Sequence, residues 1–294
     1  MTMAARGVAS NTLHQWQTDA LDAAAANRQI EGDDASYTTA APTVMLSNYT
    51  QIVRKTILVS RTADRVRKYG RDRETARLIV KRGKEIKRDV EFAIVQNQAS
   101  SAGGSATARS SAGLESMITN YTVSSTTTVA AATVPGYAAG VWTAPTDGTT
   151  AGFVTLTEPM LKTAIEQTWV DGGDASVIMS NTFQKKMAAA FAGTAKFAGN
   201  YVNQGRTTQG VVVGGVDLYI SDHGEHRWKL NRHMRQSVLF VLDPEYVELA
   251  WLDRIKPQSL AKTGDAEKSM MIGEFTLVVG NPDAHAQIRG LAMA

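Results

Sequence analysis

Between Gly70 and Gln98 the chain alternates apolar and charged residues with the period of an amphipathic helix. Apolar or small residues recur every three or four positions on one side, and charged residues occupy the other sides. Asp72 is placed to cap the free amides of the first turn. We therefore predict a helix over Asp72–Gln98, about 26 residues long and roughly 39 Å at 1.5 Å per residue.

Two features of this helix carry further expectations. Lys81 with Glu85, and Lys87 with Glu91, lie four residues apart and are expected to form ion pairs. A glycine inside a helix costs about 1 kcal/mol relative to alanine. Gly83 is therefore expected to mark a close approach of another backbone.

The segment Asn48–Ser60 is rich in β-branched and aromatic residues, which predicts a strand. Neither of its two sides is purely polar, so a ribbon lying against another surface fits better than a half-solvated sheet. Because a two-stranded ribbon is not stable alone in water, something else must bind it. Thr12–Asn27 is ambiguous, since its first half suits a strand and Ala23–Ala26 favour a helix.

The second half of the chain shows conventional patterning. A helix is predicted from Thr157, with Pro159 in its first turn and Leu161, Ile165 and Trp169 on its buried side. The mixed order of helices and strands lacks a repeating βαβ unit, which indicates an α+β fold. The further predicted elements are a helix over Phe183–Phe191 and strands over Ser176–Met179, Val211–Ile220, Ser237–Leu242, Tyr246–Leu252 and Met270–Val279.

Thr122–Phe153 is a low-complexity stretch of Thr, Ala and Gly that also contains Pro135 and Pro145. Such a composition supplies little to a core, so we expect a surface excursion. Long loops of this kind are usually functional or mobile.

Composition excludes several classes of protein. The 294 residues include no cysteine, which removes disulfides and thiolate metal sites. No apolar run is long enough to cross a bilayer, and residues 1–11 lack the apolar region of a signal peptide. The net charge of +3 is too small to indicate a nucleic-acid-binding protein by itself.

The distribution of charge is more informative than the total. Residues 1–40 carry two basic and five acidic residues, whereas residues 41–70 carry six basic and one acidic residue. The acidic set includes Glu31, Asp33 and Asp34 in a predicted turn. The basic set is Arg54, Lys55, Arg61, Arg65, Arg67 and Lys68.

No catalytic or cofactor motif emerges. Residues 222–233 bring His223, His226 and His233 near Asp222 and Glu225, but the spacing fits no zinc signature. No G-x-x-x-x-G-K-[ST] loop and no G-x-S-x-G elbow is present. We therefore predict that the protein is not an enzyme and binds no cofactor. Two alternatives are kept: a metal site in the histidine-rich segment, and a DNA-binding surface formed by the basic residues of Arg61–Arg88.

Eight sequence blocks, in their order along the chain, resemble a group of tailed-bacteriophage major capsid proteins. They extend from about residue 12 to residue 291. The chain departs from the usual pattern of these proteins in two ways. The segment before the first block is shorter than usual, and the Thr122–Phe153 stretch is longer than usual. The blocks are H-Q-W-Q-T-D-A-L, N-R-Q-I-E-G-D-D-A, S-N-Y-T-Q-I-V-R-K, E-I-K-R-D-V-E-F-A-I, V-D-L-Y-I-S-D-H-G, V-L-F-V-L-D-P-E-Y-V-E-L-A-W-L, S-L-A-K-T-G-D-A-E-K and G-N-P-D-A-H-A-Q-I-R-G-L.

The resemblance implies the capsid shell fold shared by tailed phages, herpesviruses and encapsulins, and makes Thr12–Leu21 a strand. It divides the chain into an N-terminal arm, an extended β-ribbon loop, a spine helix with a peripheral domain, a surface excursion, an axial domain and a return to the peripheral domain. These parts correspond to residues 1–11, 12–68, 69–121, 122–156, 157–238 and 239–294.

The function that the resemblance implies is structural: copies assemble as pentamers and hexamers into an icosahedral head around double-stranded DNA. Scaffold, portal and decoration proteins are the further partners it implies, with no membrane, and assembly would take place in the bacterial cytoplasm. An encapsulin-like compartment or a basic DNA-binding protein are the alternatives. We expect inter-subunit contacts to involve the acidic turn, the basic run and Gly83, that is Glu31, Asp33, Asp34, Arg54, Lys55, Arg61, Arg65, Lys68 and Gly83.

Overall fold

The structure is a computed structural model that describes most residues of the chain. Among these residues, no helix combines the length and apolar character needed to cross a membrane. The described residues are 3–35, 37, 39–67, 69–70, 73–123, 134–147, 152–193 and 217–293.

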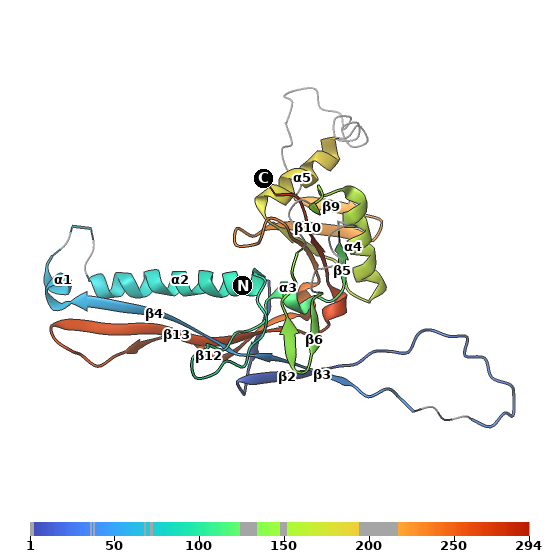
Figure 1. The fold of residues 1–294 in the computed structure, drawn as a ribbon, viewed down its shortest axis with the longest axis horizontal. Helices are drawn as coiled ribbons and strands as arrows, with labels where there is room; N and C mark the ends of the chain where they lie inside the picture. Colours follow the sequence, from blue (N-terminus) through green and yellow to red (C-terminus); the bar gives the residue numbers. More distant parts are fainter. Residues whose placement is uncertain are drawn as a thin grey trace.

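A four-stranded sheet with one long helix along it forms the elongated part of the molecule (Figure 1). The helix, α2 (Glu74–Val95), buries Ile86, Val90 and Ala93 at helical spacing. Alternate residues of β4 are buried beneath it, as expected for a strand with one covered face. The strands, in their order across the sheet, are β1 (Ala5–Val8), β12 (Val247–Ser259), β13 (Ala266–Val279) and β4 (Gln51–Ser60).

A six-stranded sheet forms the second part, where α4 (Glu158–Val170) and α5 (Thr182–Gly193) pack. Its central strands β11 and β8 are buried along their whole length, which explains why their sequences are continuous apolar runs. The strands, in order, are β5 (Tyr121–Val123), β14 (Ala286–Arg289), β11 (Leu239–Leu242), β8 (Val177–Ser180), β10 (Gly224–Leu230) and β9 (Leu218–Ser221).

Smaller elements connect these two parts or project from them. A two-stranded ribbon leads into a long irregular loop that extends away from the rest of the molecule (Figure 1). These elements are β2 (Leu13–Thr18) and β3 (Val44–Tyr49) in the ribbon, α1 (Arg61–Arg65), α3 (Leu114–Met117), and the hairpin of β6 (Gly136–Ala138) and β7 (Val141–Thr143).

The main predicted elements are confirmed, except that residues 211–216 of the strand predicted over Val211–Ile220 lie outside the described residues and β9 begins at Leu218. The long helix begins at Glu74, and the capping residue expected at Asp72 lies outside the described residues. The strand predicted over Met270–Val279 lies within β13, where Met271, Phe275, Leu277 and Val279 are all buried. The strand implied for Thr12–Leu21 is found as β2.

The prediction of one strand over Asn48–Ser60 is wrong, because the chain changes sheets at Thr50. Tyr49 pairs with Leu13 in the ribbon, whereas Gln51 pairs with Phe275 in the four-stranded sheet. Thr50 is fully buried between them, and its N–H donates to Thr12 O at 2.8 Å. The ribbon therefore returns along β3, and β4 is not part of it.

The expectation of a surface excursion over Thr122–Phe153 is wrong for residues 134–147. Trp142 is 1% exposed, and its indole N–H donates to Ser47 O at 2.8 Å. Tyr137 packs against Trp142 with ring centroids 4.9 Å apart. The two aromatic side chains bury a hairpin that the Thr/Ala/Gly composition did not indicate, and residues 124–133 and 148–151 lie outside the described residues.

Three finer expectations are also corrected. Trp169 is 61% exposed and not on the buried side of α4. Glu85 pairs with Arg82 at 2.6 Å and not with Lys81, and Glu91 accepts from Asn231 and not from Lys87. In both cases a carboxylate on the flank of α2 has another neighbour closer than the expected lysine.

Candidate interaction surfaces

The loop between β2 and β3, residues 19–43, is here called the arm. Its base is anchored, because the Trp16 indole N–H donates to Val279 O at 3.1 Å. Beyond the base, Leu21 is 99% exposed and Tyr37 is 96% exposed. Large apolar side chains that pack on nothing within their own chain indicate a surface made to be covered by a partner.

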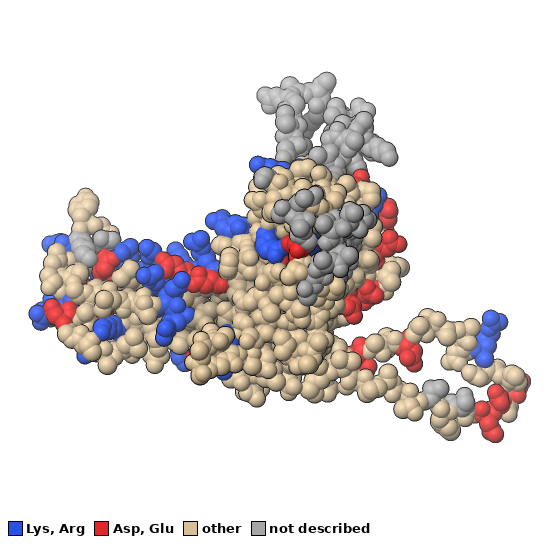
Figure 2. Space-filling view, viewed as in Figure 1, with Lys and Arg blue, Asp and Glu red and all other residues tan. Residues whose placement is uncertain are grey.

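The arm is also acidic, with five carboxylates against Arg28 alone (Figure 2). Glu31 and Gly32 form a turn in which Gly32 has φ of 83°, a conformation that favours glycine. The Asp33 N–H closes this turn by donating to Ile30 O at 3.2 Å. The predicted acidic residues, Glu31, Asp33 and Asp34, are therefore exposed together in the middle of the arm.

The predicted basic residues do not lie on the ribbon. They lie on β4 and α1, at the opposite end of the molecule from the arm (Figure 1). Lys55 pairs with Asp89 at 2.7 Å and Arg61 with Asp265 at 2.9 Å, whereas Arg54 on β4 is exposed. Lys68 lies outside the described residues. Intramolecular pairing of the acidic turn with this basic end is thus excluded by distance.

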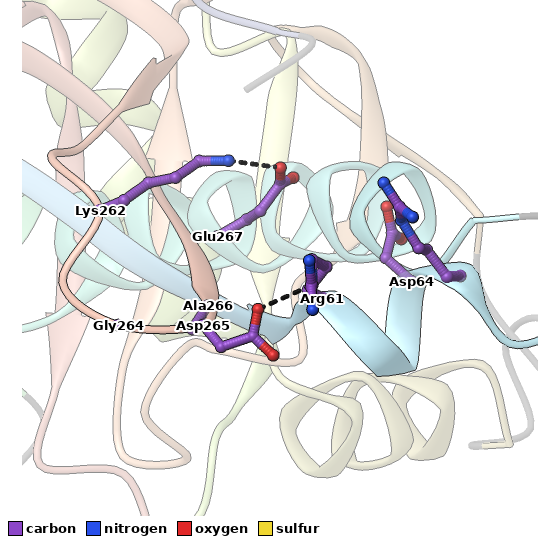
Figure 3. Close-up of a pocket in the computed structure, with 8 residues that line it drawn as sticks. Arg61, Asp64, Lys262, Gly264, Asp265, Ala266 and Glu267 are labelled. Carbon is purple, nitrogen blue, oxygen red and sulfur yellow. Dashed lines mark hydrogen bonds and ion pairs between the residues drawn. The ribbon is translucent and has the colours of Figure 1, made fainter.

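A cavity of about 310 Å³ opens at this basic end (Figure 3). Its cations are largely neutralised within the chain, since Lys262 pairs with Glu267 at 2.9 Å in addition to the Arg61–Asp265 pair. The backbone N–H of Thr75 donates to Asp64 and lowers the pKa of that carboxyl. The cavity is lined by Arg61, Asp64, Arg65, Lys262, Gly264, Asp265, Ala266 and Glu267.

No described residue makes the close backbone approach that was expected at Gly83. A Cβ atom at this position would meet only the end of the Met271 side chain, at 3.7 Å. This distance is an ordinary van der Waals contact. The prediction therefore fails for the described part of this chain, and a contact with another subunit stays a prediction.

The histidine-rich segment 222–233 is used for packing. His226 is buried, and its ring nitrogens contact Ala175 O and, at 2.6 Å, Ser221 Oγ. Among the described residues no group of three or more His, Cys, Asp or Glu is placed to hold a metal ion. The other two histidines contact aromatic rings, His223 with Trp169 and His233 with Phe92.

A buried charge network was missed by the sequence analysis. Asp147 accepts from Arg235 and, at 2.6 Å, from Arg289, while Glu115 Oε1 lies 3.5 Å from Arg235 Nε. Glu115 is fully buried, and this burial raises its pKa to about 7 although both arginines oppose the shift. The network joins α3, the loop after β7 and the six-stranded sheet. Only the position of Glu115 between the apolar Leu114 and Met117 could have indicated it.

The arrangement of an arm, a long helix on a narrow sheet and a compact second sheet is the fold of solved phage capsid proteins, as comparison with those structures shows. The capsid asymmetric unit of cyanophage A-1(L) aligns with a TM-score of 0.62 at 12% identity, over 99% of this chain and 92% of that chain. The capsid of an empty GTA particle aligns with a TM-score of 0.59 at 10% identity, over 99% and 89%. The α+β capsid fold is therefore confirmed.

Sequence comparison identifies the particular family. The SU10 major capsid protein family matches residues 1–292, so the chain belongs to that family of bacteriophage virion proteins, which are structural proteins and not enzymes. The major capsid protein of Escherichia phage Phieco32 is 42% identical over 100 residues. That alignment spans 34% of this chain and 28% of the relative's length.

Proposed function

We propose that many copies of this chain assemble, as pentamers and hexamers, into the icosahedral shell of a phage head that encloses double-stranded DNA. Membership of a major capsid protein family supports this proposal. The observation that carries it is the arm, whose Leu21 and Tyr37 side chains are almost fully exposed to solvent. Burying such side chains on a neighbour contributes about 1.5–3 kcal/mol each before the cost of ordering the arm.

The parts of the fold then take separate roles. The arm reaches a neighbouring subunit, the four-stranded sheet with α2 forms the peripheral domain, and the six-stranded sheet forms the axial domain around the fivefold and sixfold positions. β11 and β14 lie within the six-stranded sheet, although both belong to the 239–294 segment assigned to the peripheral domain. The proposed boundary near residue 238 therefore divides the sequence into two segments, but it does not divide the strands of the two sheets.

An arm deletion tests this function. Replacing residues 20–42 by a short Gly/Ser linker leaves both ribbon strands in place and is expected to leave the subunit folded by circular dichroism. The wild-type chain is expected to form shells in negative-stain images and the deletion variant only small oligomers. Small oligomers from the wild-type chain, or normal shells from the deletion variant, would contradict the proposal.

We further propose that the acidic turn docks on the basic end of a neighbouring subunit. Exposed ion pairs contribute only about 0–1 kcal/mol each, so these charges set the register of docking more than its strength. The predicted set was Arg54, Lys55, Arg61, Arg65 and Lys68. Because Lys55 and Arg61 already have carboxylate partners, Arg54 and Arg65 are the better residues to vary.

Charge reversal tests the docking. Changing Glu31, Asp33 and Asp34 to Lys, or Arg54 and Arg65 to Glu, is expected to reduce assembly, and the combination is expected to restore it. Arg28→Glu serves as the control because it makes the arm more acidic and should not weaken docking. A combined variant that assembles no better than the worse single set would show that these charges do not meet.

Other head proteins are further proposed partners. A structure from phage G that contains major capsid and decoration proteins aligns with 99% of this chain, at a TM-score of 0.50 and 11% identity. A decoration protein on the outside of the shell, together with scaffold and portal proteins during assembly in the host cytoplasm, fits the same function. Co-purification of such proteins with particles would test each of them.

A further inference from the structure

Four basic residues form one exposed line along α2, here called the α2 basic stripe: Arg77, Lys81, Lys84 and Arg88. At 100° per residue these positions fall within about 60° of each other around the helix, and they span roughly 16 Å along its axis. The line lies opposite the buried residues of α2. Lysine and arginine side chains gather over this part of the molecule (Figure 2).

The cations of the stripe are mostly unneutralised. Arg77 pairs with Glu74 in the first turn. No carboxylate of a described residue lies within 4.0 Å of the charged groups of Lys81, Lys84 or Arg88. A stripe left with uncompensated charge is a surface suited to a polyanion.

The carboxylates of α2 point to other neighbours. Asp89 pairs with Lys55 on β4 at 2.7 Å, and Glu85 pairs with Arg82 at 2.6 Å. The Asn231 side chain donates to Glu91 at 2.8 Å. Glu85, Asp89 and Glu91 are thus engaged by groups outside the stripe, and, among the described acidic residues of α2, Glu74 alone pairs with one of its members, Arg77.

The opposite surface of this part of the molecule has a different character. On β4 the residues that alternate with the buried ones point away from α2, and they include Ile52 at 53% and Leu58 at 65% exposure together with the exposed Arg54. Apolar side chains of this size suit contact with protein. The two faces therefore differ in how their cations are arranged: on α2 they form one line, whereas on the sheet Arg54 and Lys268 alternate with apolar side chains.

We propose that the α2 basic stripe contacts the phosphates of the enclosed double-stranded DNA, so that α2 faces the interior of the shell. This inference rests on the proposed function. Contacts of this kind are independent of sequence and release counterions, so their signature is a strong salt dependence. Each phosphate contact adds about 0.9 to the slope of log affinity against log salt for double-stranded DNA.

The test compares two sets of substitutions with the same charge change. The stripe variant is Lys81→Gln, Lys84→Gln and Arg88→Gln, and the control variant is Arg254→Gln, Lys256→Gln and Lys268→Gln on β12 and β13. Binding of the unassembled full chain to a fluorescent DNA duplex of mixed sequence is measured between 50 and 200 mM salt. Circular dichroism checks that both variants are folded.

In the stripe variant the slope of log affinity against log salt concentration is expected to be smaller by about 2.7. Between 50 and 200 mM salt the wild-type chain should therefore lose about 40-fold more of its affinity for DNA than the stripe variant loses. The control variant is expected to keep the wild-type slope. An unchanged slope in the stripe variant, or an equal decrease in both variants, would overturn the inference. Because the binding assay needs no shells, a failure of shell assembly by the wild-type chain is recognised separately by imaging.

Discussion

The buried carboxyl of Glu115 should make the stability of the subunit depend on pH. Burial raises the pKa of Glu115 from 4.5 to about 7, against the attraction of Arg235 and Arg289. The folded state therefore favours the protonated form. Its stabilising contribution is complete below pH 4.5 and is lost as the pH rises through about 7.

The size of the effect follows from the shift. One pKa unit corresponds to about 1.4 kcal/mol, so the shift from 4.5 to about 7 is worth roughly 3 kcal/mol. Glu115→Gln removes the titration and keeps a side chain of similar volume. The free energy of unfolding of the wild type minus that of the variant should fall by about 3 kcal/mol between pH 4.5 and 8.

Urea unfolding of the unassembled full chain, followed by tryptophan fluorescence across this pH range, measures that difference. Glu85→Gln provides a control in which the pH dependence of the free energy of unfolding has the opposite sign, since the hydrogen bond from Arg82 lowers the pKa of Glu85. The stability that Glu85 contributes is present above its ordinary pKa and is lost as the pH falls. Parallel pH profiles for the wild type and Glu115→Gln would refute the reasoning.

Two further predictions concern packing. Trp142→Ala should lower the free energy of unfolding by about 3–5 kcal/mol, measured by urea unfolding. Its exposed neighbour is the control, because Val141→Ala should change the same free energy by less than about 0.5 kcal/mol. Equal effects would show that the hairpin is not part of the core. Gly83→Ala should be tolerated, because its Cβ meets only the end of the Met271 side chain. Gly83→Leu should block shell formation in negative-stain images and leave the helix intact by circular dichroism. Normal shells from Gly83→Leu would remove Gly83 from the proposed contacts.

Elements whose signals are local could be predicted from the sequence. The periodicity of α2 reflects one buried face, which can be recognised from residues three and four positions apart. The apolar run at the end of β13 reflects burial on both faces and is equally local in the sequence. The implied β2 strand required the family resemblance, because propensity alone left Thr12–Asn27 ambiguous. The α+β class followed from the order of the elements.

Features that depend on distant partners could not be predicted. Nothing in Asn48–Ser60 indicates that pairing passes from β2 to β13 at Thr50, because both partners lie far away in the sequence. Trp142 stands in a stretch of small residues, and its burial depends on the pocket that the rest of the fold supplies. The position of the acidic turn in an exposed arm was expected, but the placement of the basic residues at the other end of the molecule was not.

The pairing of the strands also has a consequence for synthesis of the chain. Ala5 pairs with Glu248 and Ser60 with Ala266 in the four-stranded sheet, and Tyr121 pairs with Gln287 in the six-stranded sheet. Because the ribosome releases the N-terminal strands first, β1, β4 and β5 must wait for β12, β13 and β14 before either sheet can close. Long-range pairing of this kind is slow and leaves apolar faces open to aggregation in the meantime. Both sheets therefore close only after the segment up to β14 has been synthesised, and until then the arm projects from an unfinished subunit.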